Sequence, residues 1–289
     1  MATRIGIIGG SGLYDLDGLT HVRDVSLSTP FGDPSDALRT GRWDNLELVF
    51  VPRHGRGHRL MPSEIPYRAN IYALKSLGVD TVISVSAVGS MREELHPGDV
   101  VLPTQYVDRT RARPATFFGD GLVAHVSLAD PVCPWLVETL STASAACGLR
   151  HKTGGTYICI DGPAFSTRAE SNIFRSWGVD IIGMTALPEA RLAREAEMHY
   201  ATLALVTDYD CWHATEAAVS VDDVIAVLRQ NSANVQRILQ RALPQLRALD
   251  APTSCSCTDA LRDAIITARD AISQTRRDEL APIVSKYLG

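Results

Sequence analysis

The feature that most constrains the fold of this chain is a series of seven short apolar runs that are rich in β-branched residues. Each run has the length of a strand, and most of them end in Gly, Pro, Asp or Ser. Helical patterns separate several of the runs, and strands that alternate with helices favour an α/β fold built on a parallel or mixed sheet. The predicted strands cover residues 4–8, 46–51, 81–85, 100–102, 156–160, 180–182 and 202–206.

Helical periodicity is present in four longer segments, and the last of them contains Pro244, where we expect the helix to break. These segments cover residues 67–77, 134–147, 189–198 and 221–249. Residues 250–256 have the composition of a linker, and apolar residues at helical spacing predict one more amphipathic helix over residues 261–272. Because this remainder is too short for a second domain, we expect one domain over residues 1–250 and a helical extension of it over residues 251–289.

Composition and charge exclude several classes of protein. The 289 residues are 45% hydrophobic and 21% charged, as in a globular protein that buries a sizeable core without disulfides or metals. The net charge of -5 gives no sign of a broad basic surface for nucleic acid. No apolar run reaches the ~18 residues of a membrane span, and the N-terminus lacks a signal peptide. We therefore expect a cytoplasmic protein with small-molecule partners and with no nucleic-acid or membrane partner.

The six cysteines fall into two groups. Four of them lie apart in apolar or mixed contexts, where a buried reduced thiol is expected, at positions Cys133, Cys147, Cys159 and Cys211. The other two, Cys255 and Cys257, form a C-x-C pair in the predicted linker. Two unrelated reduced thiols are as good an interpretation of this pair as a functional one.

Four glycines within the first twelve residues form a glycine-rich turn after the first predicted strand. Their order fails the dinucleotide-binding pattern G-x-G-x-x-G, the phosphate-loop pattern G-x-x-x-x-G-K-[ST] and the serine-hydrolase pattern G-x-S-x-G. The turn still exposes backbone N–H groups and the hydroxyl of Ser11, which suit an anion. A tight turn without a ligand is an equally good interpretation of these residues alone.

A basic loop after the strand at residues 46–51 is a second candidate for anion binding. Arg53 offers a planar fork of N–H donors that matches phosphate, and His54 lies beside it. His54 and His58 have the spacing of a zinc pair on a helix, but two intervening glycines disfavour a helix and the adjacent arginines would repel a cation. We therefore expect no metal, and a solvated basic loop is the alternative to an anion site.

Small polar groups also follow two other predicted strands. Ser86 and Ala87 offer a hydroxyl and a backbone amide directly after residues 81–85. Met184 could cover a sugar with an adaptable apolar side chain, and Thr185 could donate to an anion. Taken one at a time, these residues are equally well explained by a plain turn and a core methionine.

Two acids, Asp208 and Asp210, follow the apolar run at residues 202–206. A solvated turn or a helix cap would explain such a pair by itself. All of these groups nevertheless share one type of location, the end of a predicted strand, where α/β sheets bind ligands. Anion donors, an apolar sugar cover and two acids in one place suggest a nucleoside together with free phosphate.

Seven stretches of the chain, in order over residues 4–245, resemble the trimeric purine nucleoside phosphorylase family, in particular its members that cleave 5'-deoxy-5'-methylthioadenosine. They are IGIIGGSGLYD, TPFGDPSDAL, VPRHGRGHRLMPSEIPYRANIYALKSLG, SAVGSMREELHPGDVV, DGPAFSTRAES, MTALPEARLAREAEMHYA and TDYDCWHATEAAVSVDDV. The resemblance implies a nucleoside phosphorylase-like fold with a central mixed sheet flanked by helices, in a homo-oligomer that is a trimer or a hexamer. It also implies that the chain is a pentosyltransferase of purine and methionine salvage. The expected products are adenine and 5-methylthioribose 1-phosphate, with inorganic phosphate as co-substrate and no cofactor.

The resemblance also assigns roles to individual residues. The phosphate-binding set would be Ser11, Arg53, His54, Ser86, Ala87 and Thr185. The nucleoside-binding set would be Met184 on the ribose, Phe165 and Ser166 beside the base, Asp208 and Asp210 on the purine edge, Val221 and Val224 around the 5'-methylthio group, and His125, which would reach the pocket of a neighbouring subunit. Ser11 and Ser86 stand where many relatives have Thr, so a hydroxyl is retained at both positions. In long-tailed members a C-x-C pair can form a disulfide, and the assembly can be a hexamer.

The acid pair suits the departure of an adenine base. Burial would keep Asp208 protonated, so that it could donate to N7 of the leaving purine, while Asp210 would accept from the 6-amino group. Relatives that prefer 6-oxo purines have Asn at the position of Asp208. The alternatives are therefore a phosphorylase for adenosine, inosine, guanosine or methylthioinosine, a hydrolytic nucleosidase and a non-catalytic nucleoside sensor.

Overall fold

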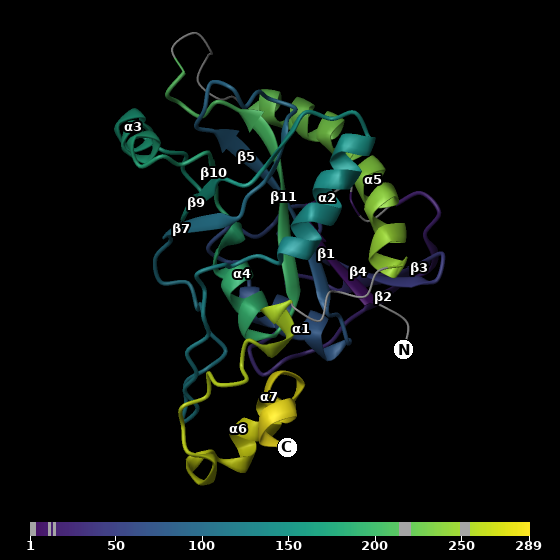
Figure 1. The fold of residues 1–289 in the computed structure, drawn as a ribbon, viewed down its shortest axis with the longest axis vertical. Coiled ribbons are helices and arrows are strands. Elements are labelled where there is room, and N and C mark those ends of the chain that lie inside the picture. The colour runs from purple at the N-terminus through teal and green to yellow at the C-terminus, as the bar shows by residue number, and fades with distance from the viewer. Residues whose placement is uncertain (1–3, 11–12, 14–15, 214–220, 249–254) are drawn as a thin grey trace.

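The computed structural model describes residues 4–10, 13, 16–213, 221–248 and 255–289, apart from the side chains of residues 221–230, 247 and 248. Within these residues, eleven strands form one mixed sheet with helices packed against it (Figure 1). The strands are β1 (Arg4–Gly9), β2 (Thr20–Val25), β3 (Leu38–Trp43), β4 (Leu46–Pro52), β5 (Thr81–Ser90), β6 (Val100–Leu102), β7 (Gln105–Arg109), β8 (His151–Thr153), β9 (Thr156–Ile160), β10 (Ile181–Gly183) and β11 (His199–Asp208).

The central strand β5 divides the sheet. Its first half pairs in parallel with β1, and its last two residues pair antiparallel with β10 on the same edge. Among the described residues, no strand pairs with residues 85–88 on that edge, so the sheet opens there. The other edge of β5 pairs in parallel with β11 along almost its whole length.

The helices cover the sheet in two contacting pairs, α2 with α5 and α1 with α4 (Figure 1). The helix α2 starts with proline at its first position, as the sequence predicts, and a reciprocal pair of hydrogen bonds between Thr167 and Glu170 caps α3. The helical elements are α1 (Tyr67–Ser76), α2 (Pro134–Ala146), α3 (Arg168–Ser176), α4 (Ala186–Glu195), α5 (Val221–Ala248), the 3-10 turns η1 (Ser256–Asp259) and η2 (Arg269–Ala271), α6 (Gln274–Glu279) and α7 (Ala281–Leu288).

The predicted α/β fold with a central mixed sheet flanked by helices in a single domain is confirmed. Each of the seven predicted strands falls on an observed strand, and the four longer predicted helices correspond to α1, α2, α4 and α5. The sequence interpretation missed β2, β3, β7, β8 and α3. These strands are short or carry polar residues at exposed positions, so they lack the apolar run by which the others were recognised.

Two expectations about helices are wrong. The helix α5 continues through Pro244, because buried side chains on both sides of the proline, among them Leu243 and Leu246, hold it against the core. Residues 261–272 do not form a helix. Ile265 instead makes a β-bridge with Ala124, and the amides and carbonyls of residues 123–125 and 264–266 pair with each other. Strand-like pairing across the chain has thus overridden the helical spacing.

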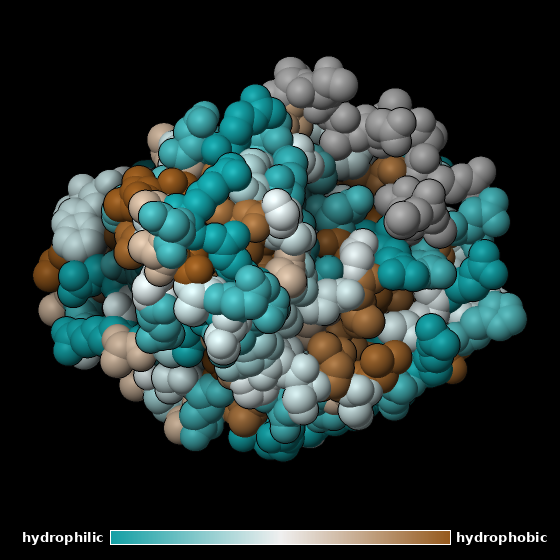
Figure 2. All heavy atoms as spheres, turned by 90° about the horizontal axis from the view of Figure 1, so that it is seen from below, coloured by the Kyte–Doolittle hydropathy of each residue, from teal (hydrophilic) through white to brown (hydrophobic). Residues whose placement is uncertain are grey.

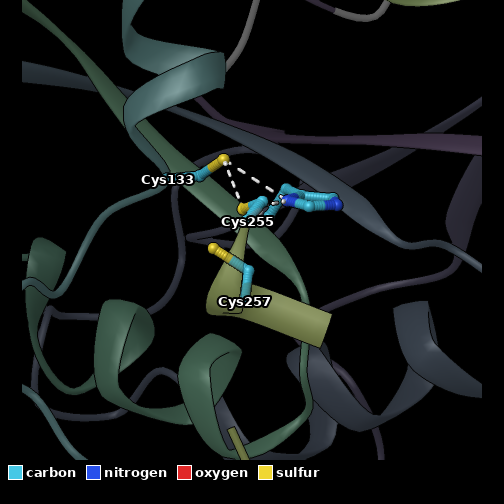
Figure 3. A group of neighbouring side chains, drawn as sticks. Cys133, Cys255 and Cys257 are labelled. Carbon is cyan, nitrogen blue, oxygen red and sulfur yellow. Dashed lines mark hydrogen bonds between the residues drawn. The ribbon is translucent and has the colours of Figure 1, made fainter. Parts of the chain in front are cut away.

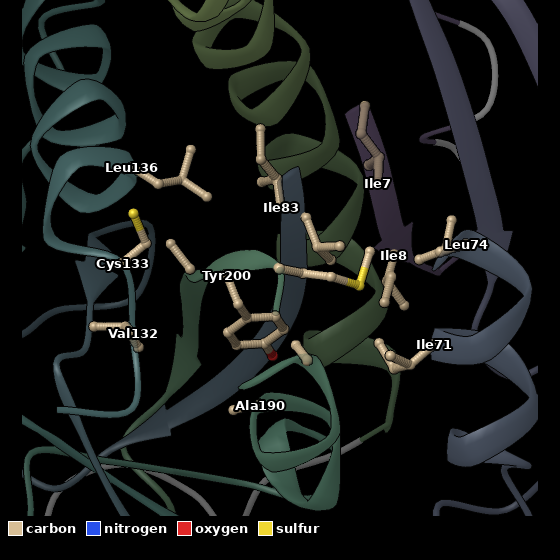
Figure 4. Packing of buried hydrophobic residues seen from close by; sticks show 14 of the residues in the cluster. Ile7, Ile8, Ile71, Leu74, Ile83, Val132, Cys133, Leu136, Ala190 and Tyr200 are labelled. Atoms are coloured by element: carbon tan, nitrogen blue, oxygen red, sulfur yellow. The ribbon is translucent and has the colours of Figure 1, made fainter. Parts of the chain in front are cut away.

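The main apolar core lies between the sheet and the helices, and a second, smaller cluster includes Met91, Ile158 and Phe174. Figure 4 shows Ile7, Ile83 and Tyr200 of the sheet packed among side chains of α1, α2 and α4. These three side chains are at most 1% exposed. Burial of each such side chain contributes on the order of 2 kcal/mol, which fixes the strand ends that carry the site.

The C-terminal segment packs onto the same core, below the sheet in Figure 1. Leu261, Leu280 and Ile283 are buried in it, and the hydroxyl of Tyr72 on α1 donates to the carbonyl of Glu279 at 2.7 Å. Seen from this side, Figure 2 shows apolar side chains in separate groups among hydrophilic ones. The predicted domain boundary near residue 250 lies outside the described residues. Within the described part of the chain, no helix is long and apolar enough to cross a membrane.

Candidate active site

A cavity of about 310 Å³ lies where the sheet opens beside residues 85–88 of β5. Residues at the ends of five other strands and in the segments that follow them complete its wall. It is lined by Gly10 after β1, by Arg53, His54, His58 and Pro62 after β4, by residues 85–89 of β5, by Ile160, Phe165 and Ser166 of and after β9, by residues 182–185 of and after β10, and by Thr207, Asp208 and Asp210 of and after β11. All strand-end groups singled out from the sequence therefore contribute to one cavity.

The guanidinium of Arg53 is buried, and most of its N–H groups donate hydrogen bonds to other groups of the protein. Its Nε and Nη2 atoms donate to the two carboxylate oxygens of Glu189 at 2.9 and 3.0 Å. Nη1 donates to the carbonyl of Val85 at 2.7 Å, and Nη2 also donates to Ser84 Oγ at 2.7 Å. Four of the five N–H groups are thus engaged, so Arg53 has at most one N–H of Nη1 for a ligand.

Glu189, which the sequence interpretation did not single out, neutralises this buried charge. Its carboxylate also accepts hydrogen bonds from Ser84 Oγ at 2.6 Å and from the hydroxyl of Tyr200 at 3.0 Å. A buried ion pair of this kind is costly to break, because the remaining charge would be left without a partner. Arg53 and Glu189 therefore form a rigid, buried ion pair, of which Arg53 lines the cavity.

His54 is held as a neutral imidazole. Burial, together with the nearby charge of Arg53, lowers its pKa to about 4, although the hydrogen bond to the carbonyl of Leu60 opposes this shift. Nδ1 lies 2.9 Å from that carbonyl, which can only accept, so Nδ1 carries the proton and Nε2 is an acceptor. In this state His54 would accept from a protonated phosphate oxygen rather than donate to it.

Three hydroxyls meet at the opening beside β5. Ser86 Oγ lies 3.1 Å from Thr185 Oγ1 and 3.4 Å from the hydroxyl of Tyr157. Ala87 is exposed in the middle of an otherwise buried strand. On the edge of β5 that faces the cavity, no described strand pairs with it. The hydroxyls of Ser86 and Thr185 therefore lie together in the cavity wall, beside the edge of β5 that no described strand covers.

Close packing holds the segment after β10 in place. A Cβ on Gly183 would lie 2.1 Å from the hydroxyl oxygen of Tyr157, so only glycine lets that tyrosine approach. The buried Arg113 donates through Nη1 to the carbonyls of Met184 and Leu187, both at 2.8 Å. These contacts fix the backbone that presents Met184 and Thr185 to the cavity.

A β-bulge at the end of β11 positions the two acids. The register with β5 shifts between Val206 and Asp208, and Thr207 Oγ1 then donates to the carbonyl of Val88 at 3.2 Å. The carboxylate of Asp208 accepts from Thr207 Oγ1 at 2.6 Å and from the amide of Asp210 at 2.8 Å. Asp210 has a φ of 54°, which turns the chain sharply so that both acids line the cavity.

Burial raises the pKa of both carboxyl groups. For Asp208, this effect exceeds the opposing hydrogen bonds from Thr207 and the Asp210 amide. For Asp210, burial raises the pKa, a hydrogen bond from Ser171 lowers it, and the negative charge of Asp208 raises it further. Two buried acids this close titrate as a pair, and the pair retains a proton more readily than a solvated carboxylate would.

Phe165 and Ser166 line the same cavity as the acids. Phe165 is 56% exposed at the mouth of the cavity, although it is a large apolar side chain. The hydroxyl oxygen of Ser166 is buried and has no hydrogen-bond partner in the described part of the structure. An exposed aromatic ring and an unsatisfied buried hydroxyl next to the acid pair provide a stacking surface and a polar contact for a flat ligand.

One described residue of the predicted set, His125, does not line this cavity. His125 lies beside the C-terminal segment, where its amide donates to the carbonyl of Ala264 at 2.9 Å. Ser11 and the side chains of Val221 and Val224 lie outside the described residues. The sequence interpretation missed Glu189, Tyr157 and Thr207. Thr207 is the only one of these with a signal in the sequence, since it adjoins the acid pair.

Comparison with known proteins agrees with this geometry. Residues 4–244 match the phosphorylase superfamily. The chain is 55% identical to an S-methyl-5'-thioadenosine phosphorylase of Geobacter sulfurreducens, over 98% of this chain and 99% of that protein. It is 52% identical to the protein of the same name from Thermosynechococcus vestitus, over the full length of both.

Solved structures give the same result. The crystal structure of a methylthioadenosine phosphorylase from an Antarctic soil metagenomic library superimposes with a TM-score of 0.92 at 49% identity, and covers 98% of this chain and 99% of that one. A methylthioadenosine phosphorylase from Schistosoma mansoni in complex with adenine superimposes with a TM-score of 0.86 at 36% identity, over 91% of this chain and 99% of that one. The chain belongs to the phosphorylase superfamily and, within it, to the S-methyl-5'-thioadenosine phosphorylases.

Proposed function

We propose that the protein cleaves 5'-deoxy-5'-methylthioadenosine with inorganic phosphate, and that the products are adenine and 5-methylthioribose 1-phosphate. The observation that carries this proposal is the single cavity that joins a buried acid pair to a cluster of hydroxyl donors. The protein is a pentosyltransferase that serves purine and methionine salvage. Phosphate is a co-substrate, and the reaction requires no cofactor.

At the base end of the cavity, Asp208 protonates the leaving purine. Breaking the bond between N9 and C1' leaves negative charge on the base, and Asp208, whose pKa is raised by burial, donates a proton to N7 as this charge develops. Asp210 accepts from the 6-amino group, and Phe165 and Ser166 border the ring. The relative from Schistosoma mansoni, which was crystallised with adenine, supports a 6-aminopurine as the base.

At the other end, phosphate binds beside the opened edge of β5. Ser86 and Thr185 donate through their hydroxyls, and Ala87 lines the same cavity. Arg53 contributes one N–H at most, and the neutral His54 accepts from a phosphate hydroxyl. Ser11 completes this set as a prediction from the sequence. The bound anion stabilises the positive charge that develops on the sugar and then captures C1'.

Met184 covers the ribose, and Val221 and Val224 surround the methylthio group. The 5' end of the pocket is completed by His125 from a neighbouring subunit, which requires a homo-oligomer, a trimer or a hexamer. Two large apolar side chains near His125 support a contact surface there. Val123 and Ile266 are 41% and 64% exposed, and the amide of Ile266 donates to the carbonyl of Val123 at 3.0 Å. The cytoplasmic location stays a prediction from the sequence.

One assay tests the proposal. Purified protein is incubated with methylthioadenosine in the presence and absence of phosphate, and both products are identified by mass spectrometry. We expect adenine and 5-methylthioribose 1-phosphate in equal amounts, and only when phosphate is present. Release of free 5-methylthioribose without phosphate would instead identify a hydrolase, and binding without turnover would identify a sensor.

A further inference from the structure

A second group of chemically reactive side chains lies at the amino end of β11, whereas the cavity lies at the carboxyl end of this strand. The thiols of Cys133, Cys255 and Cys257 and a ring nitrogen of His199 all lie within 4.8 Å of one another. Figure 3 shows Cys133 at the start of α2 close to Cys255 and Cys257, which both belong to the C-terminal segment. We propose that these four side chains form a structural zinc site of the Cys3His type.

Three of the distances between these atoms match those of a tetrahedral zinc site, and Cys257 Sγ lies within 4.8 Å of the other three ligand atoms. Cys133 Sγ lies 3.7 Å from Cys255 Sγ. His199 Nδ1 lies 3.3 Å from Cys133 Sγ and 3.5 Å from Cys255 Sγ. Bonds of ~2.3 Å to sulfur and ~2.05 Å to nitrogen at tetrahedral angles place sulfur atoms about 3.8 Å apart and sulfur about 3.5 Å from nitrogen. Four ligands from one chain fill the coordination sphere, which is typical of a structural site and not of a catalytic one.

Each ligand is held by the fold before any metal binds. Cys133 caps the start of α2, and its amide donates to the carbonyl of Tyr200 at 2.8 Å. His199 is the first residue of β11, and its amide donates to the carbonyl of Asp80 at 2.8 Å. Cys255 caps η1 and Cys257 lies within that turn, so the C-x-C pair presents both thiols to the same point.

The surroundings suit a buried zinc thiolate. Cys133, His199 and Cys257 are 0, 4 and 2% exposed. Three thiolates and one Zn²⁺ carry a net charge of -1, and the buried guanidinium of Arg194 acts on Cys257 with the opposite sign. Binding would release the thiol protons to solvent, and the oxidation state of no atom would change. Cys255 is partly exposed and lines a cavity of about 540 Å³, which provides a path for the ion.

A zinc ion here would fasten three parts of the molecule together. The ligands come from the start of α2, from the start of β11 and from the C-terminal segment that begins at Cys255. The segment is also linked to the rest of the chain by hydrogen bonds, among them those that the amide of Leu261 and the hydroxyl of Tyr287 donate to Glu197, in the turn between α4 and β11. The sequence alone predicted no metal, because it considered the C-x-C pair without Cys133 and His199.

A disulfide is the competing state. All six cysteines are free in the structure, and three thiols meet at one point with a histidine. A disulfide would use two of these thiols and would leave the third thiol and the imidazole without a role, whereas a zinc ion uses all four ligands. The two states differ in metal content and in the number of thiols that react with an alkylating agent.

The test uses the untagged full-length protein purified from zinc-supplemented medium. After dialysis against EDTA, we expect about one zinc ion per chain by inductively coupled plasma mass spectrometry, and six alkylated cysteines after denaturation without reductant. Replacement of zinc by Co²⁺ should give the visible bands of a tetrahedral site and a thiolate charge-transfer band. Zinc far below one per chain without cobalt bands, or only four alkylated cysteines, would overturn the proposal.

Two variants make the assignment specific. Cys257→Ser should lose at least tenfold in retained zinc and lower the melting temperature by roughly 5–15 °C. Cys147→Ser, at the far end of α2, is the matched control and should keep both values. If Cys257→Ser does not fold, the zinc content and cobalt spectrum of the unmodified protein still decide the question. Equal zinc retention in both variants would show that the metal binds elsewhere and would refute the site.

Discussion

The two ends of β11 carry two very different groups of side chains. At its carboxyl end, Asp208 lines an open cavity together with the hydroxyl-bearing Ser86 and Thr185 and with Arg53, which has at most one N–H left for a ligand. At its amino end, His199 meets three thiols, and the four candidate ligand atoms lie within 4.8 Å of one another. The open group retains unused hydrogen-bonding capacity, and the closed group has all of its ligand atoms within reach of a single ion.

This difference indicates what each end is for. A site that performs chemistry must leave polar groups unsatisfied until the substrate arrives, and the buried hydroxyl of Ser166 is one such group. A site that provides stability is complete within the chain, as structural zinc sites are. We therefore expect changes at the carboxyl end to alter rates and specificity, and changes at the amino end to alter stability and metal content.

The largest effect is expected for Asp208→Asn. This change removes the acid that protonates N7, so kcat/KM for methylthioadenosine should fall by about 100-fold or more. The loss for the matching 6-oxo nucleoside should be much smaller, because an amide can donate to a 6-oxo group. Steady-state kinetics on both nucleosides measure the ratio. An unchanged ratio of kcat/KM between the two nucleosides would show that Asp208 takes no part in base recognition. Loss of zinc from the Asp208→Asn variant would show that the two ends of β11 are not independent.

A smaller effect is expected for Gly89→Ala. A Cβ at this position would lie 2.9 Å from Asp208 Oδ1 and 3.0 Å from Ile182 Cγ2, so the carboxylate must move. Displacement of a catalytic group by less than an ångström should lower kcat/KM by roughly 10- to 100-fold. The KM for phosphate should stay the same, since the hydroxyl cluster is not touched. Unchanged nucleoside kinetics would mean that the position of Asp208 is less constrained than we propose.

The smallest effect is expected for Thr185→Val, which removes a hydroxyl and keeps the shape of the side chain. One hydrogen bond to a charged ligand is worth about 1.5–3 kcal/mol, so the KM for phosphate should rise by about 10-fold or more, with little change in the KM for the nucleoside. Cys257→Ser provides the comparison from the other end of the strand. It should leave the phosphate KM and the ratio of 6-amino to 6-oxo activity unchanged.

The sequence predicts the buried part of the fold well and its edges poorly. Strands such as β1 and β11 are recognised because burial on both faces requires continuous apolar residues. The edge strand β2 is exposed along its length and carries no such signal. The helix expected over residues 261–272 is wrong because pairing between Ile265 and Ala124, far apart in the chain, cannot be read from local spacing.

The site shows the same limit. Residues at strand ends, such as Asp208 and Thr185, can be found from the sequence because a parallel sheet brings strand ends together. Glu189 could not, because its role depends on the burial of Arg53, 136 positions earlier in the chain. The zinc cluster could not either, because Cys133, His199 and Cys255 are brought together only by the path of the folded chain.

A crystal structure of the protein with phosphate and a non-cleavable methylthioadenosine analogue would test the account of the cavity most directly. We predict that the purine edge lies within hydrogen-bonding distance of Asp208 and Asp210. In the same cavity, we predict that the phosphate is bound by Ser86 and Thr185 with C1' between the two ligands. A phosphate on another surface, or a base that does not contact the two acids, would contradict the account.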